Sequence, residues 1–274
     1  MHEKPSGPAI RATSVLLQGY PTTAVKNLWL VADGSGLATS YLALPDVDTR
    51  NVAVYGLSSP FVKRTDGMSQ YSFADLVDSY IVEMRRRQPH GPYYLGGWSA
   101  GGTCAFLAAQ RLVDEGETVE RLILIDSPKP IGLEKLPFRL FDDFNRLGVF
   151  GTAGRSPPEW LRHHFEGFNN MLHAYEPLPF QTSGAGQSQL KTWVVWATDG
   201  VAADGSIEIF PSDPPNVPWL LRSRSDSVLG PNGWDQLVGH ENMTIERLHG
   251  AHHFNMLNEP SAKGVSEFLA RAMA

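Results

Sequence analysis

The motif GWSAG at residues 97–101 constrains the fold of this 274-residue chain more than any other segment. It directly follows the apolar run YYLGGW (93–98), which predicts a strand, and it opens residues 100–112, where apolar side chains recur at helical spacing. A G-x-S-x-G motif between a strand and a helix is typical of a nucleophile elbow, whose sharp turn holds its serine in a strained backbone conformation. The small glycines on either side let the strand and the helix approach each other. The pattern therefore predicts Ser99 to be a nucleophile.

The rest of the chain alternates short apolar runs with amphipathic helical stretches. We expect helices over about 72–87, over about 100–112 and after Pro260, and strands over 27–32, 51–55, 93–98, 119–125, 191–197 and 242–248. Strand and helix in this rhythm indicate an α/β domain with a mostly parallel, doubly wound sheet. Together with the elbow, the pattern predicts the α/β-hydrolase fold.

The length allows one large α/β domain, which we place at residues 14–274. Residues 1–13 contain Pro5, Gly7 and Pro8 and no apolar run, and they predict a linker in a longer protein. Residues 199–218, dense in Asp, Gly, Ser and Pro, predict a long surface loop without chemistry.

An aromatic-rich segment interrupts the alternation of strands and helices between the fourth and fifth expected strands. Nine of the fifty residues 131–180 are aromatic, against 10% in the whole chain. We expect a helical lid insertion over about 131–190, packed above the carboxyl edge of the sheet, where open α/β folds bind ligands. The substrate chamber that it encloses is predicted to include Phe138, Phe141, Phe165, Phe168 and Met171.

Composition excludes several classes of function. A formal net charge of −6 makes nucleic-acid binding a poor interpretation, because phosphate neutralisation needs a basic face. The single cysteine, Cys104, cannot form an intramolecular disulfide, which favours an intracellular, cytoplasmic protein. No stretch is long and apolar enough to predict a membrane span, and apart from the vicinal histidines no His/Asp cluster has metal-ligand spacing. The sequence does not set the oligomeric state.

A weakly nucleophilic serine needs an imidazole base and a carboxylate that orients the imidazole. His249, His252 and His253 follow the last expected strand, where this fold places its base, and spacing leaves both His252 and His253 open. For the acid, Asp126 and Asp199 both stand at strand ends.

We favour Asp126 as the acid because Ile125 and Pro128 frame it at the end of an apolar strand, whereas Asp199, the alternative, opens a glycine-rich loop. Replacing Asp126 by Asn is expected to keep the fold and to remove most of the activity.

An oxyanion hole for such a serine would use backbone N–H groups near the elbow. The first comes from Ala100 at the start of the helix, and the second from the loop after the first strand, at Gly34 or Ser35. Asp33 in the same loop is expected to have a structural role.

Four segments together carry a more specific resemblance: WLVADGSGLATSY (29–41), GPYYLGGWSAGG (91–102), RLILIDSPKPIGLEKLP (121–137) and GAHHFNM (250–256). From residue 14 onward the chain resembles the product-releasing thioesterase and Claisen-cyclase domain of fungal non-reducing iterative polyketide synthases. The resemblance implies Ser99 as nucleophile, Asp126 as acid and His253, in its His-Phe-x-Met pattern, as base. The additional histidine at 252 departs from that pattern.

The resemblance also implies a reaction. A polyketide arrives as a thioester on the phosphopantetheine of an acyl carrier protein domain of the same synthase and is transferred to Ser99. The ester is then resolved by Claisen-type C–C closure or by pyrone-forming C–O closure, and the domain itself binds no cofactor. The substrate would be an aromatic polyketide thioester.

Two alternatives remain. The first is hydrolytic release, or an editing thioesterase or esterase that acts on acyl thioesters. The second is a binding module on a hydrolase scaffold, which the sequence favours least because nucleophile, acid and base all occur in the expected order.

Overall fold

The computed structural model describes residues 9–62, 64–65, 67–150, 157–180 and 190–274. Within them the strands form one sheet of order β1-β3-β2-β4-β5-β6-β7. Their bounds are β1 (Thr13–Gln18), β2 (Lys26–Val31), β3 (Val52–Ser58), β4 (Tyr93–Trp98), β5 (Val119–Ile125), β6 (Lys191–Asp199) and β7 (Met243–His252). Only β1 pairs antiparallel, with β3; the other pairings are parallel. The predicted α/β-hydrolase fold is confirmed.

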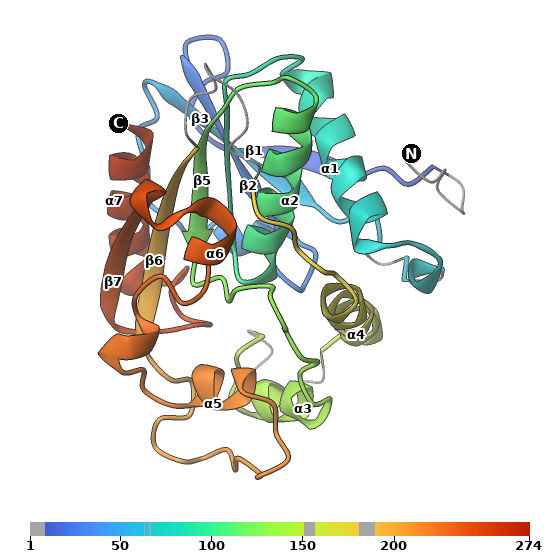
Figure 1. Ribbon diagram of the computed structural model, residues 1–274, viewed down its shortest axis with the longest axis vertical. Coiled ribbons are helices and arrows are strands. Elements are labelled where there is room, and N and C mark those ends of the chain that lie inside the picture. Colours follow the sequence, from blue (N-terminus) through green and yellow to red (C-terminus); the bar gives the residue numbers. More distant parts are fainter. Residues whose placement is uncertain (1–8, 63, 66, 151–156, 181–189) are drawn as a thin grey trace.

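Helices cover both faces of this sheet (Figure 1). One face carries α1 (Phe73–Arg87), α2 (Ala100–Asp114) and the short α6 (Asp235–Val238), and the other carries α7 (Ser261–Met273). The central strand β4 is buried along its whole length, and β5 over its last four residues, as expected for parallel strands with helices on both sides. Two apolar cores therefore hold the sheet rigid from opposite faces.

The first strand, β1, is the strand that the sequence analysis missed. Residues of β1 show no alternation of buried and exposed positions, and Val15 and Leu16 are exposed, so the pattern carries no strand signal. Its pairing with β3 is a long-range contact that local sequence does not encode. Ala12 is buried and Thr13 begins β1, so the domain starts before residue 14, while residues 1–8 of the expected linker lie outside the described residues.

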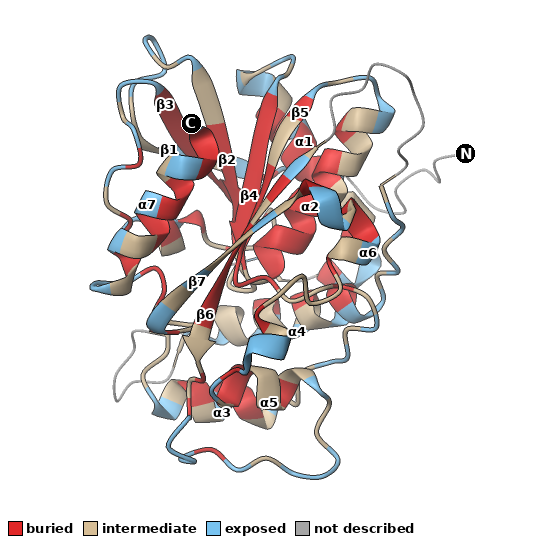
Figure 2. Ribbon diagram, turned by 60° about the vertical axis from the view of Figure 1, so that its left-hand side comes forward, coloured by how far each residue is buried: buried red, intermediate tan, exposed pale blue. Residues whose placement is uncertain are grey.

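A helical cap lies beyond the carboxyl ends of the strands (Figures 1 and 2). It contains α3 (Arg139–Arg146), α4 (Glu159–His173) and α5 (Asn216–Leu221). The segment 199–218 was predicted to be a surface loop, and this is wrong in part: Ala202, Ile207 and Val217 are buried against Leu140 and Phe144 of α3. The few apolar residues of this segment are surrounded in sequence by small and polar residues, so the sequence pattern does not predict their burial.

The described residues also form short 3-10 helices: η1 (Ala38–Tyr41), η2 (Met68–Gln70), η3 (Asp226–Val228) and η4 (His240–Asn242). In the described part of the chain, no helix combines the length and the apolar character needed to cross a membrane.

Candidate active site

Ser99 occupies the sharp turn between β4 and α2, with φ 56° and ψ −130°. A residue other than glycine adopts this backbone region only when its surroundings enforce it. A Cβ at Gly97 would lie 2.2 Å from the carbonyl carbon of Gly101, and a Cβ at Gly101 would lie 2.3 Å from the carbonyl oxygen of Val31. Both motif glycines are therefore required by close backbone approach, as the sequence analysis predicted.

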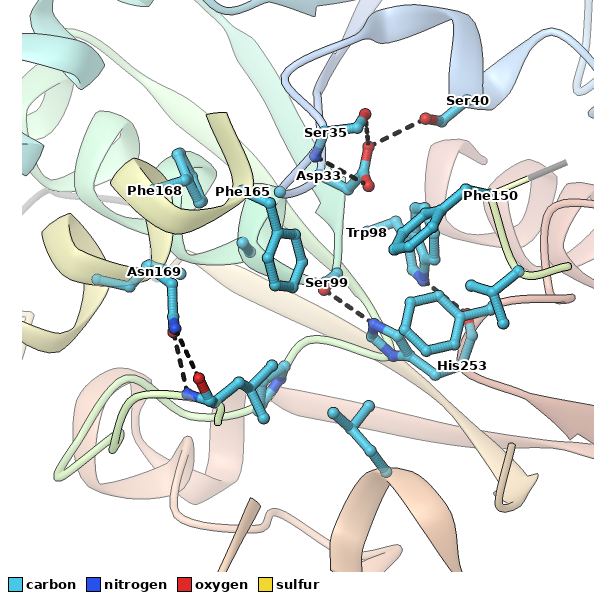
Figure 3. Close-up of a pocket in the computed structure, with 18 of the residues that line it drawn as sticks. Asp33, Ser35, Ser40, Trp98, Ser99, Phe150, Phe165, Phe168, Asn169 and His253 are labelled. Atoms are coloured by element: carbon cyan, nitrogen blue, oxygen red, sulfur yellow. Dashed lines mark hydrogen bonds between the residues drawn. The ribbon is translucent and has the colours of Figure 1, made fainter. Parts of the chain in front are cut away.

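Ser99, His253 and Asp126 form one continuous chain of hydrogen bonds. His253 Nε2 lies 2.9 Å from Ser99 Oγ (Figure 3), and His253 Nδ1 lies 2.7 Å from Asp126 Oδ2. Because an ionised carboxylate only accepts, Nδ1 carries the proton and Nε2 is left to accept the serine hydroxyl proton. The three residues come from the ends of β4, β5 and β7, which the parallel sheet brings to one edge.

The base is held from several sides. Trp98 Nε1 donates to the backbone carbonyl of His253 at 3.0 Å, and the Trp98 ring lies 5.3 Å from the imidazole. Trp219 and Phe254 meet the same imidazole edge to face, at centroid distances of 5.9 and 4.9 Å. Only 4% of the His253 side chain is exposed, so its orientation toward Ser99 is fixed by packing.

The alternative acid and base lie apart from this chain of hydrogen bonds. His252 Nδ1 accepts the backbone N–H of Phe254 at 3.2 Å, and Asp199 accepts the hydroxyl of Thr198 at 2.9 Å. The two residues are cross-strand partners in the β6–β7 ladder. β7 ends at His252, and the next residue, His253, is the one whose ring reaches the serine.

Arg224 is a member of the site that sequence reasoning missed. Its Nη2 donates to Asp126 Oδ2 at 2.9 Å, its Nη1 donates to Oδ1 of the same carboxylate, and its guanidinium lies 3.6 Å from the Trp219 ring centroid. Arg224 lies in the coil that follows α5. Its distance along the sequence from the elbow is not part of any known motif, so no sequence pattern identifies it.

Asp126 is completely buried, and that burial acts to raise its pKa. The hydrogen bond from His253 and the positive charge of Arg224 outweigh this effect, and the pKa of Asp126 lies below its usual value. The backbone N–H of Ala197 adds a further hydrogen bond to Oδ1 at 3.0 Å. The carboxylate therefore stays ionised within the protein interior.

The loop after β2 approaches the elbow and carries the candidate oxyanion donors. Gly34 and Ser35 both line the cavity beside Ser99 and Ala100, and the N–H of Ser35 donates to Asp33 Oδ2 at 3.3 Å. Ala100 is the first residue of α2, so its N–H has no partner within the helix. Because the N–H of Ser35 is engaged with Asp33, Ala100 and Gly34 remain the predicted donors.

Asp33 organises this loop. Its Oδ1 accepts the hydroxyls of Ser35 and Ser40 at 2.8 and 3.0 Å (Figure 3). Burial raises the pKa of Asp33, and the hydrogen bonds from Ser35 and Ser40 offset this only in part.

His164 of α4 joins the cap to the same loop. Its Nδ1 donates to the Gly34 carbonyl at 3.0 Å, and its Nε2 accepts the hydroxyl of Ser59 at 2.9 Å. Burial lowers the pKa of His164, which favours the neutral imidazole.

A cavity of about 360 Å³ lies between the sheet edge and the cap. Ser99 and His253 are on its floor, and Phe165 and Phe168 line it as predicted (Figure 3). The cap contributes further apolar and aromatic side chains to the wall, from the segment 133–172 and from α5: Leu133, Leu136, Val149, Phe150, Trp160, Leu161, Leu172, Trp219 and Leu220. Besides Ser99 and His253, polar side chains also line the cavity: Asp33, Ser35, Thr39, Ser40, Thr103, Glu134, Asn169, Asn216 and Asn258.

The other predicted chamber residues are not in the wall, which corrects the sequence analysis. Phe141 is buried behind it, within 4.7 Å of Phe150 and 5.6 Å of Phe165 between ring centroids. Phe138 is 39% exposed, and Met171 packs into the core beneath α4. Helical periodicity places these residues on an apolar face, but the tilt of each helix decides which residues of that face meet the cavity.

Among the described residues, no group of three or more His, Cys, Asp or Glu side chains is arranged to hold a metal ion.

Comparison with known proteins identifies the family to which this arrangement belongs. The family model described as "Thioesterase domain" matches residues 27–269, which include all the residues of the hydrogen-bonded chain. The chain belongs to the thioesterase-domain family. This confirms the predicted serine-dependent thioesterase of the α/β-hydrolase superfamily.

Curated relatives of this thioesterase domain are much longer proteins. It is 52% identical over 263 residues to the non-reducing polyketide synthase ustP of Ustilaginoidea virens, and 48% identical over 278 residues to the conidial pigment polyketide synthase alb1 of Aspergillus fumigatus. In both cases 96% of this chain matches, and the match spans 12% of the relative's length. The resemblance to the fungal non-reducing synthases is confirmed.

Solved structures of the same fold include the NocB thioesterase domain in covalent complex with a fluorophosphonate nocardicin G analog. The TM-score is 0.65 at 22% identity, covering 96% of this chain and 99% of that one. RedJ, a thioesterase from the prodiginine pathway of Streptomyces coelicolor, matches with a TM-score of 0.60 at 15% identity, covering 98% and 97%. These likenesses support the fold.

Proposed function

We propose that this thioesterase domain releases a polyketide from an acyl carrier protein by forming an ester on Ser99 and closing a ring. The observation that carries the proposal is the continuous hydrogen-bonded chain from Ser99 through His253 to Asp126 on the floor of an aromatic cavity. The relatives that are half identical to this chain are polyketide synthases, which supports a polyketide as the acyl group.

Acyl transfer would use each member in one role. Ser99 Oγ attacks the thioester carbonyl as its proton moves to His253 Nε2, and Asp126 stabilises the imidazolium that forms. The negative charge on the carbonyl oxygen is stabilised by the N–H groups of Ala100 and Gly34. The C–S bond then breaks, and His253 returns the proton to the departing phosphopantetheine thiol.

Release would reuse the same base. His253 Nε2 removes a proton from a carbon acid or an enol of the bound polyketide, and that atom attacks the ester carbonyl. The C–O bond to Ser99 breaks, and the serine recovers its proton from His253. Carbon attack gives Claisen-type closure, enol-oxygen attack gives a pyrone, and water in place of either gives hydrolysis.

The cavity supports cyclisation over hydrolysis. Its walls are mostly apolar, with Phe150, Phe165 and Phe168 from the predicted lid insertion and Trp219 from α5. Aromatic walls favour a folded aromatic chain, because rings stack on rings, and a chain that fills the space displaces water from the ester.

The proposed partner is the acyl carrier protein domain of the same synthase, which brings the substrate on its phosphopantetheine. No cofactor bound by this domain is needed for either step. We place the protein in the cytoplasm, on the evidence of a sequence with a single cysteine.

The test combines intact-protein mass spectrometry with product analysis. The domain and its Ser99→Ala variant are mixed with an aromatic polyketide-like thioester. We expect a mass increase corresponding to the acyl group in the parent only, and a released product lighter than the free acid by one water. Release of the free acid would show that the domain hydrolyses the ester and does not cyclise it. Absence of loading on the folded parent would contradict the proposed acyl-enzyme intermediate.

A further inference from the structure

The carboxylate of Asp126 is contacted by four donors. They are His253 Nδ1, the backbone N–H of Ala197, and both terminal nitrogens of Arg224. The Asp126 side chain is 0% exposed and that of Arg224 is 1% exposed. An ionised group at this depth is tolerated only with a matched countercharge and a full set of hydrogen bonds.

Arg224 itself is fixed as firmly as the carboxylate. Its Nε donates to the carbonyl of Trp219 at 3.0 Å, and its Nη1 also donates to the carbonyl of Ala197 at 3.1 Å. The indole of Trp219 lies against the guanidinium on one side and meets the His253 imidazole edge to face. The arginine and the base therefore share one oxygen, Oδ2, and one aromatic neighbour.

We propose that Arg224 is a positioning residue that supplies the countercharge of Asp126 and thereby keeps His253 unprotonated and ready to act as the base. The inference rests on the proposed catalytic roles of Ser99, His253 and Asp126. With Arg224 present, the resting site is neutral: one guanidinium, one carboxylate, a neutral imidazole and a neutral serine. In the transition state the new imidazolium is matched by the new oxyanion, and the site is neutral again.

Without Arg224, the one other ion-pair partner of Asp126 among the described residues would be the imidazolium of His253. The resting protein would then hold a proton on Nε2 up to a higher pH, and Ser99 would have no acceptor for its own proton. The arginine thus acts on the nucleophile through the base, although it does not contact the serine and does not itself line the cavity.

Other ionisable groups also act on this site. His252 and Asp199 lie on β7 and β6 at the edge of the triad, and Asp33 lies in the loop after β2. All three remain in place when Arg224 is changed, so a comparison of variants at constant ionic strength isolates the contribution of the arginine.

The experiment measures the rate at which a fluorophosphonate probe labels Ser99 between pH 5 and 9. Ser99 Oγ forms a bond to phosphorus, fluoride leaves, and the hydroxyl proton passes through His253 to water. Because labelling needs only the triad, it does not depend on knowing the polyketide. In Arg224→Gln, which keeps a donor and loses the charge, the acidic limb should move to higher pH by about one to three units.

Two further variants make the test specific. Arg224→Lys keeps the charge, so its acidic limb should stay near that of the parent while its maximal rate falls. Arg222→Gln changes a neighbouring arginine whose Nη1 donates to the carbonyl of Ala202, away from the triad, and its profile should match the parent.

The outcomes separate the two proposals. Failure of the folded parent to be labelled at Ser99 would overturn the catalytic triad itself. Normal labelling with an unmoved acidic limb in Arg224→Gln would overturn only the role of Arg224. If the glutamine variant does not fold, the lysine variant still decides: a shift of about one unit or more despite the retained charge would contradict the inference.

Discussion

The two sides of the cavity are built by different physical means. On the sheet side, Ser99, Asp126 and His253 are fixed by hydrogen bonds and by backbone contacts that leave no room for a Cβ. On the cap side, the wall is made mostly of rings and aliphatic side chains, and His164 links the cap to the sheet side through the carbonyl of Gly34. Directional contacts hold the reacting atoms, whereas non-directional contacts shape the space above them.

This difference separates reactivity from selectivity. Hydrogen bonds and close backbone contacts tolerate shifts of only a few tenths of an ångström, so the sheet side suits chemistry that must be positioned accurately. Apolar packing can be redistributed among side chains of similar volume, so the cap can be altered without dismantling the triad. We expect changes on the sheet side to affect rate and stability, and changes in the cap to affect the choice of substrate and product.

The largest effect is expected for Asp126→Asn. The rate of Ser99 labelling should fall by about 10⁴-fold, because Asn does not hold the imidazole in the required tautomer. The fold should be kept, but the free energy of unfolding should fall by about 3 kcal/mol or more, because Arg224 becomes an unpaired buried cation. Labelling kinetics and urea unfolding measure the two effects. A variant as active as the parent would transfer the role of the acid to Asp199.

Two glycine substitutions compare the sides directly. A Cβ at Gly101 would lie 2.3 Å from the backbone carbonyl of Val31, so Gly101→Ala should cost about 3 kcal/mol or more of stability, with loss of labelling. A Cβ at Gly167 in the cap helix α4 would meet only the flexible side chain of Met68, and alanine favours the helix. Gly167→Ala should therefore change stability by no more than about 1 kcal/mol. Equal losses in urea unfolding would contradict the distinction.

A smaller effect is expected for Phe165→Ala in the cavity wall. Loss of the ring should raise KM for an aromatic thioester about tenfold and increase the share of hydrolysed product, because water fills the vacated space. Labelling of Ser99 by a small fluorophosphonate should stay near the parental rate. The matched control is Phe138→Ala, which removes a ring that is 39% exposed and outside the wall. An unchanged product ratio in Phe165→Ala would show that this ring does not exclude water.

The smallest effect concerns the dependence of stability on pH through His164. Its folded pKa is below the ordinary value of 6.5, so the unfolded chain binds the proton more readily. The stabilising contribution of neutral His164 is complete above pH 6.5 and is lost as pH falls through the lowered folded pKa. The stability advantage of the parent over His164→Gln should therefore shrink from pH 8 to pH 5 in urea unfolding. His163→Gln, at an exposed neighbouring position, should show no such trend.

The parts of the site that sequence reasoning found are those encoded over a few residues. The elbow requires glycines at fixed offsets from Ser99, and Asp126 follows a strand recognisable by its apolar run. The choice between His252 and His253 came from the family pattern, and the geometry agrees with it. The remaining members of the site, Trp219 and Arg224, lie between the predicted loop 199–218 and the predicted strand 242–248, where no motif or periodicity gave a prediction.

The sequence by itself determined the alternation of strands and helices, the strained serine and the order of nucleophile, acid and base. These are local properties, because periodicity and glycine spacing act over a few residues of chain. Only the tertiary structure decided that β1 joins the sheet, that Phe165 faces the cavity while Phe141 lies behind it, and that Arg224 meets Asp126 from 98 residues away. Such contacts depend on how separate elements pack, and neither composition nor spacing specifies the partner that a buried charge will find.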